Sequence, residues 1–136
     1  MLTADHWNTL RSMMNRIIPQ DDFPNAWDAG VGNYLSRQLA RDLKHQVENY
    51  RLGLNALEAE SRAYSGKSFT ELDTSTQDKL LSRLETGEVT IPWPVNPADF
   101  FHMVIGHVME GFYSDPGNGG NRDSVAWRMI RFESHE

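Results

Sequence analysis

The apolar residues of this chain recur at the three- and four-residue spacing of a helix in several separate stretches. The first stretch covers residues 3–18, and its apolar face is formed by Trp7, Leu10, Met14, Ile17 and Ile18. Thr3 is suited to cap the start of a helix, and Pro19 cannot continue it. The pattern therefore predicts an N-terminal helix followed by a turn-rich connection.

A longer apolar stripe covers residues 31–64. Its first part contains Tyr34, Leu35, Leu39 and Leu43, and its second part contains Val47, Tyr50, Leu54 and Leu57. This length exceeds that of an ordinary globular helix, so we expect either one extended helix or a bend between Ala40 and Lys44. Gly66 is suited to end the second part.

Residues 73–87 form a third amphipathic segment, with Leu80, Leu81 and Leu84 on the inner face and Gly87 at the end. Asp73, Thr74 and Ser75 are the candidates for its cap. The stretch VTIPWPVNP, residues 89–97, follows with three prolines. Proline excludes a helix there, so we expect an extended strap.

Asn96 and Pro97 are a strong helix start, because Asn caps well and Pro fits the first turn. The following segment, PADFFHMVIGHVMEGFY, is apolar on most sides, which predicts a central helix. SVAWRMIRF adds one or two turns near the C-terminus. The sequence thus predicts an all-α fold: one compact domain over residues 1–136 with about five helices, a Pro-rich strap and a Gly-rich C-terminal loop.

Composition narrows the functional classes. The chain has 136 residues, a formal net charge of -6, no cysteine and a hydrophobic share of 39%. The size and apolar content suit one globular domain. The negative charge argues against a nucleic-acid partner, and the lack of cysteine excludes thiolate nucleophiles and Cys-based metal sites. No stretch reaches the about 20 apolar residues of a membrane span.

His102, His107 and Glu110 on the predicted central helix are the candidates for a metal site. His107 and Glu110 share a face, but His102 lies roughly 140° around the helix from His107 at 3.6 residues per turn. No G-x-S-x-G elbow or phosphate-binding loop is present. Hydrogen-bonded or surface roles for the three residues therefore compete with the metal hypothesis.

Trp93 stands between two prolines in the strap. Tryptophan is enriched at binding hot spots, and a Pro-flanked segment has little capacity to form its own secondary structure. We therefore predict that Trp93 anchors a protein partner.

The stretch EGFYSDPGNGGNRDSVAW, residues 110–127, gathers Pro116 with residue types that tolerate positive φ. Together with the following RMIRF, it resembles the C-terminal signature of the gluconate 2-dehydrogenase subunit 3 family. The opening LTADHWNTLRSMMNRIIPQDD, the stretch AGVGNYLSRQL and the pattern around Phe69 to Leu81 are similar to the same family. The resemblance covers nearly the whole chain.

The resemblance implies an all-α small subunit with no catalytic, cofactor-binding or metal residues of its own. Its partner would be a large FAD-dependent dehydrogenase of the glucose–methanol–choline (GMC) type, with a cytochrome c subunit as a further candidate. The residues that match the signature, which we expect at or beneath the contact with the large subunit, are Ser114, Asp115, Pro116, Gly119, Gly120 and Asn121. The family implies the periplasm, whereas the start MLTADHWNTL lacks the features of a signal peptide, so the cytoplasm is the alternative.

Three functional hypotheses follow. The leading one is a non-catalytic subunit that binds, stabilises and helps to mature or export a flavin-dependent sugar or polyol dehydrogenase. The second is a small metal-dependent enzyme that uses His102, His107 and Glu110. The third is a free-standing helical interaction module.

Overall fold

The computed structural model of the chain describes residues 1–20 and 24–113, and the fold predicted from the sequence is confirmed there. The described residues form five α-helices and two short 3₁₀ helices, with no strand among them. Their bounds are α1 Ala4–Ile17, α2 Val31–Ala40, η1 Lys44–Gln46, α3 Val47–Ser65, η2 Phe69–Glu71, α4 Thr74–Thr86 and α5 Pro97–Phe112. The predicted C-terminal turns in SVAWRMIRF lie outside the described residues.

The helix ends follow from local chemistry. Thr3 and Asn96 each accept a backbone N–H of the first turn with a side-chain oxygen, as their sequence positions predict. Of the three candidates for the cap of α4, Asp73 is the one that accepts such a bond. Gly66 and Gly87 end α3 and α4 in the left-handed conformation, both with a φ of 78°. That conformation is readily adopted only by glycine, so these two residues stop the helices cleanly.

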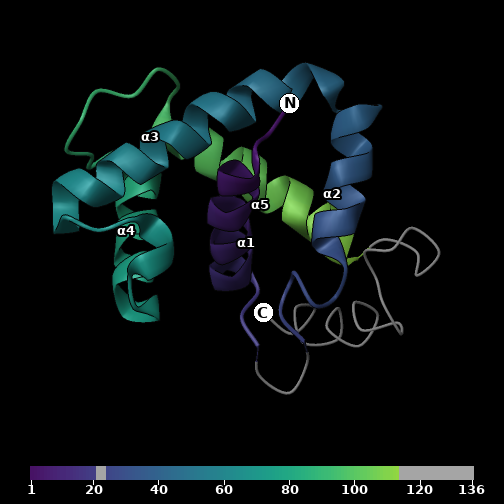
Figure 1. Cartoon of the computed structure of the whole chain (residues 1–136), viewed down its shortest axis with the longest axis horizontal. Helices are drawn as coiled ribbons and strands as arrows, with labels where there is room; N and C mark the ends of the chain where they lie inside the picture. The colour runs from purple at the N-terminus through teal and green to yellow at the C-terminus, as the bar shows by residue number, and fades with distance from the viewer. Residues whose placement is uncertain (21–23, 114–136) are drawn as a thin grey trace.

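The long apolar stripe of residues 31–64 is interrupted, so the bend between Ala40 and Lys44 is the correct one of the two alternatives that the sequence left open. α2 ends at Ala40, and α3 begins at Val47 after a turn and the 3₁₀ helix η1. The backbone of Arg41, with φ -130° and ψ -102°, leaves the helical region and makes the break. As a result, α2 descends along one side of the molecule while α3 crosses its top (Figure 1).

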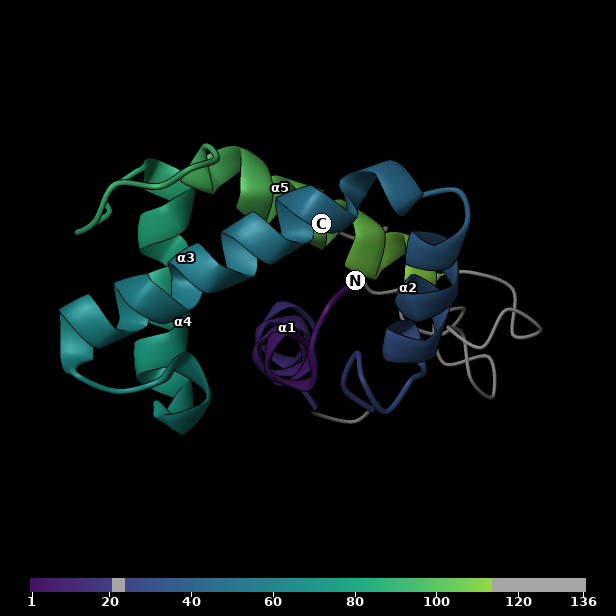
Figure 2. The same cartoon turned by 45° about the horizontal axis from the view of Figure 1, so that its top comes forward.

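α5 is the central helix, as its all-round apolar character predicts, because it contacts α1, α2, α3 and α4. In Figure 2, α1 is seen end-on beneath α3 and α5, with α4 on one side and α2 on the other. α1 therefore packs in the middle of the molecule, enclosed by the other four helices. The buried side chains of α5 are Phe100, Phe101, Val104, Val108 and Phe112.

Two glycines let other helices approach α5 closely. A Cβ placed on Gly53 of α3 would overlap the ring of Phe100, and one placed on Gly111 would lie 2.8 Å from Cδ2 of Tyr34 in α2. Real Cβ atoms do not approach neighbours so closely, so both crossings depend on the missing side chain. The Phe100 ring is also flanked by Tyr50 at 6.2 Å and Trp93 at 6.1 Å between ring centroids.

We expect Gly53→Ala to lower the free energy of unfolding by about 1–3 kcal/mol, because the added methyl displaces the Phe100 ring from a packed core. The matched control is Gly106→Ala on α5, where a Cβ would meet nothing within 4 Å. That control should stabilise the protein slightly, since alanine is the better helix former. Urea unfolding followed by circular dichroism measures both effects, and equal stabilities for the two variants would contradict the packing argument.

Candidate functional site

The strap between α4 and α5 runs extended, as its prolines predict, and it folds against its own chain. From residue 88 to residue 96 its side chains alternate strictly between exposed and half-buried positions. The half-buried ones are Val89, Ile91, Trp93 and Val95, and the exposed ones are Glu88, Thr90, Pro92, Pro94 and Asn96. The strap therefore presents one apolar edge inward and a proline-bearing edge to the outside.

The carboxylate of Glu60, on α3, holds the strap in place. Its Oε2 accepts the backbone N–H of Thr90 at 2.7 Å, and its Oε1 accepts the backbone N–H of Ile91 at 3.2 Å. The indole Nε1–H of Trp93 donates to the same Oε1 at 3.2 Å. Glu60 is only 1% exposed, so these three donors replace the water that the charged group loses.

Burial and hydrogen bonding act on Glu60 in opposite directions. Burial by itself would raise the pKa of the Glu60 carboxyl, but the donors from Thr90, Trp93 and Ile91 outweigh it and hold the pKa below its ordinary value. The carboxylate therefore stays ionised at neutral pH. Protonation would weaken the attachment of the strap.

Trp93 is thus engaged within its own chain. Its ring packs beside Phe100, and its only polar atom is bonded to Glu60. The Trp93 side chain is half-buried, and its neighbours in the chain, Pro92 and Pro94, are exposed. Its role as an anchor for a partner stays a prediction, now for a residue fixed in position before any partner arrives.

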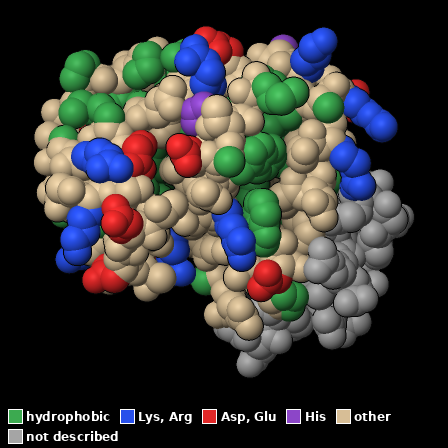
Figure 3. Space-filling view, viewed as in Figure 1, with side chains coloured by type: hydrophobic (Ala, Val, Ile, Leu, Met, Phe, Trp, Pro, Cys, Tyr) green, Lys and Arg blue, Asp and Glu red, His purple; other side chains and the backbone are tan. Residues whose placement is uncertain are grey.

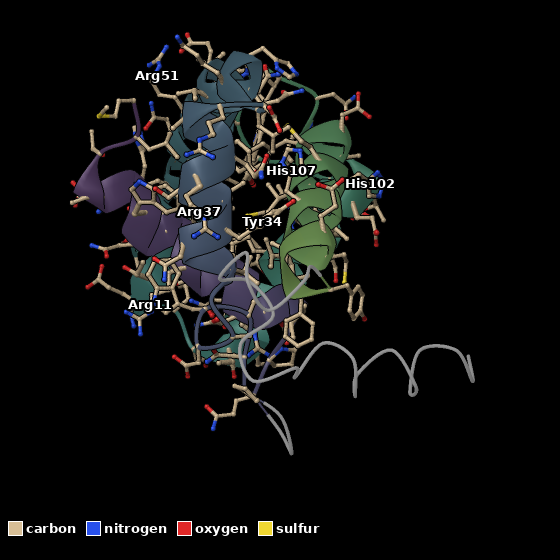
Figure 4. The ribbon with its side chains drawn as sticks, turned by 90° about the vertical axis from the view of Figure 1, so that its right-hand side faces the viewer. Arg11, Tyr34, Arg37, Arg51, His102 and His107 are labelled. Carbon is tan, nitrogen blue, oxygen red and sulfur yellow. The ribbon has the colours of Figure 1, made fainter. Side chains whose placement is uncertain are left out.

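His102, His107 and Glu110 do not come together. His102 pairs with Glu85 at 3.4 Å between Nε2 and Oε2, on the exposed side of α5. His107 instead faces inward (Figure 4), and its Nδ1 is hydrogen-bonded to the hydroxyl of Tyr50 at 2.7 Å. Within residues 1–20 and 24–113, no group of three His, Asp or Glu side chains is placed to share a metal ion. The metal hypothesis therefore lacks the geometry that it requires in the part of the chain that is described.

His107 and Tyr50 form a stacked, hydrogen-bonded pair, with ring centroids 5.7 Å apart. Burial lowers the pKa of the His107 imidazole. Burial also raises the pKa of the Tyr50 hydroxyl, and the negative charge of Glu110 raises it further. Both groups are therefore neutral at neutral pH. Tyr34 of α2 points toward His107 (Figure 4). The pKa of its hydroxyl is raised, mainly by burial and to a smaller extent by the negative charges of Glu110 and Asp42. The hydrogen bond between Tyr50 and His107 joins α3 to α5.

An apolar hollow opens where the N-terminal segment meets α2 and the start of α3. It measures about 640 Å³ and is lined by Met1, Leu2, Trp7, Ser36, Leu39, Ala40, Lys44 and Val47. Trp7 and Val47, which the helical periodicity assigns to inner faces, are only half-buried because they form its walls. Figure 3 shows hydrophobic side chains gathered in this region, and others toward the corner where the strap lies, on one face of the molecule.

The comparison with protein families identifies the family of this chain. The family model described as gluconate 2-dehydrogenase subunit 3 matches residues 4–133, almost the whole chain. The chain belongs to the gluconate 2-dehydrogenase subunit 3 family. Comparison with curated proteins and with solved structures gives no match. The family description names a subunit, which implies a catalytic partner.

For this subunit 3 chain, the signature residues of the C-terminal loop remain predictions. Ser114, Asp115, Pro116, Gly119, Gly120 and Asn121 all lie outside the described residues. The described residues that lead to the loop are Phe112, buried in the core, and Tyr113, half-buried at the end of α5. No helix among the described residues of the subunit is long and apolar enough to cross a bilayer.

Sequence reasoning missed Glu60 as the residue that positions the strap. One signal was available: Glu60 follows Leu57 by three residues and therefore lies on the buried stripe of α3. A carboxylate on an apolar stripe requires partners, but the sequence does not reveal that they come from residues 90, 91 and 93. The apolar hollow was missed for a similar reason, since periodicity identifies an inner face without showing what covers it.

We expect Glu60→Gln to lower the free energy of unfolding by about 1–3 kcal/mol, because an amide is a weaker acceptor for three donors than a buried carboxylate. The difference in free energy of unfolding between wild type and variant should be largest above the ordinary pKa of glutamate, about 4.3. It should disappear as the pH falls through the lower pKa that Glu60 has in the folded state. Urea unfolding at several pH values, with Trp fluorescence, provides the measurement. Glu88→Gln, at an exposed position on the same strap, is the control and should be near neutral.

The His107–Tyr50 pair predicts a second pH effect in a different window. Because the folded-state pKa of His107 is lowered, the unfolded chain takes up the proton more readily, and stability should fall as the pH drops below about 6.5. His107→Gln should remove this part of the pH dependence, whereas His102→Gln, at an exposed position of the same helix, should retain it. Thermal unfolding between about pH 7 and pH 5 tests the pair, and identical slopes for wild type and His107→Gln would refute it.

Proposed function

We propose that this chain is a non-catalytic small subunit that binds and stabilises the flavin-dependent catalytic subunit of a sugar, sugar-acid or polyol dehydrogenase of the GMC type. The observation that carries the proposal is the family match over residues 4–133, whose description is that of a dehydrogenase subunit. FAD would be held by the catalytic subunit. A cytochrome c subunit is a further proposed member of the complex, and the periplasm its proposed location.

Two features of the described residues support a binding role. The strap and the apolar hollow place hydrophobic side chains on one face (Figure 3). The two histidines of α5, by contrast, contact different neighbours: His102 pairs with Glu85 and His107 with Tyr50. Accessible apolar side chains and an aromatic residue already fixed in position are both typical of protein–protein interfaces.

The stabilisation would arise from shared burial of apolar surface. Obligate subunit interfaces bury roughly 2,000 Å² or more, and each Å² of apolar surface removed from water contributes about 25 cal/mol. Because Glu60 already fixes the strap, the chain loses little conformational freedom there on binding. The catalytic subunit would gain a cover for surface that otherwise favours aggregation.

Co-expression with a GMC-type dehydrogenase catalytic subunit from the same genome tests the proposal. Affinity purification through a tag on this chain should bring down a larger polypeptide at a fixed ratio, and the complex should show the absorbance spectrum of bound flavin. The catalytic subunit expressed alone should be less soluble and less stable to heat. Purification of this chain without a flavoprotein under the same conditions would contradict the proposed function.

Metal analysis of the same preparation addresses the rival hypothesis. A stoichiometric transition metal that is lost in the His107→Gln variant would favour the metal-dependent enzyme. The separate contacts of His102 and His107 lead us to expect no such metal.

A further inference from the structure

The chain is acidic as a whole, but the surface around the apolar hollow is basic. The two segments that form it, residues 1–11 and 31–47, contain four of the thirteen Lys and Arg residues and only two of the nineteen Asp and Glu residues. The four are Arg11, Arg37, Arg41 and Lys44, and the two are Asp5 and Asp42. The local sign of the charge is therefore opposite to that of the chain.

The basic side chains are available to a partner. Arg37, Arg41 and Lys44 are all exposed, and none takes part in an ion pair with another described residue. Arg37 projects from the outer side of α2 (Figure 4), one residue after Ser36 of the hollow's lining, and Lys44 is itself a lining residue. Among the lining residues, none is acidic.

The hollow is large enough for more than a solvent molecule. Its volume of about 640 Å³ lies within the range of about 300–1,000 Å³ typical of small-molecule pockets, so it has room for a large apolar side chain. The indole of Trp7 and the side chains of Leu39 and Val47 supply apolar walls. Such a pocket holds the anchor side chain of an interface well when a polar rim surrounds it.

We propose that this hollow receives an acidic amphipathic segment of the catalytic subunit, with a large apolar side chain in the hollow and Asp or Glu residues against Arg37, Arg41 and Lys44. This inference rests on the proposed function and adds to it a second contact, separate from the strap. The basic rim selects the partner by charge, and the apolar walls set how long it stays bound. A second copy of this acidic chain is disfavoured as the occupant by its overall charge of -6.

The test is a competition within the assembled complex. Wild-type and variant chains with different tags are co-expressed with a limiting amount of the catalytic subunit, and mass spectrometry measures their ratio in the purified complex. Ala40→Glu places a carboxylate at the exposed edge of the hollow, and Arg37→Gln with Lys44→Gln neutralises part of the rim. We expect each of these two variants to be under-represented about tenfold.

The matched control neutralises two lysines away from the hollow, with Lys67→Gln and Lys79→Gln, and should be incorporated equally with wild type. Thermal unfolding of each isolated variant verifies that the fold is kept.

Equal incorporation of Ala40→Glu and of the Arg37/Lys44 variant would overturn this inference while leaving the proposed function intact. Dimerisation of the chain alone that Ala40→Glu abolishes would also overturn it, because the occupant would then be a second copy. If wild type itself captures no flavoprotein, the proposed function and this inference fail together.

Discussion

The packing of the Phe100 ring on Gly53 is the contact on which the rest of the fold depends. α5 is apolar on nearly all sides, so it is stable only when other elements cover it, and α3 covers its first turns through this contact. The same ring packs beside Tyr50 and Trp93, and the contact with Trp93 packs the half-buried side of the strap against the core. Near the other end of α5, Gly111 likewise allows Tyr34 of α2 to approach closely.

Two polar contacts give this apolar framework a defined geometry. Glu60 fixes the strap to α3, and the hydroxyl of Tyr50 joins α3 to His107 of α5. Hydrophobic packing alone tolerates small shifts, whereas a buried charge or phenol without its partner costs free energy of the order of 1–3 kcal/mol. These residues therefore select one arrangement of strap and helices from the arrangements that packing would allow.

A defined arrangement suits a protein whose proposed role is to hold another protein. The strap, Trp93 and the apolar hollow are fixed by the chain itself, so that binding requires little reordering. The basic rim adds directional attraction on an otherwise acidic surface, which favours one orientation of the partner. Under the proposed function, catalytic chemistry would reside entirely in the flavin-dependent partner, and this chain would supply shape and stability.

The sequence by itself determined the helical segments, the caps at Thr3 and Asn96 and the extended strap, and it limited the cap of α4 to three residues and the course of residues 31–64 to a bend or one long helix. These features depend on residues close together in the chain, whose propensities and periodicity are readable from sequence. Short sequence motifs, above all the stretch of residues 110–127, also indicated the family, which the match over residues 4–133 confirms. Only the tertiary structure decided that Glu60 holds the strap 30 residues away, that His102 and His107 have different neighbours and that Trp7 and Val47 line a hollow. These outcomes depend on how helices cross, and crossing is set by contacts such as Phe100 on Gly53 that no local pattern encodes.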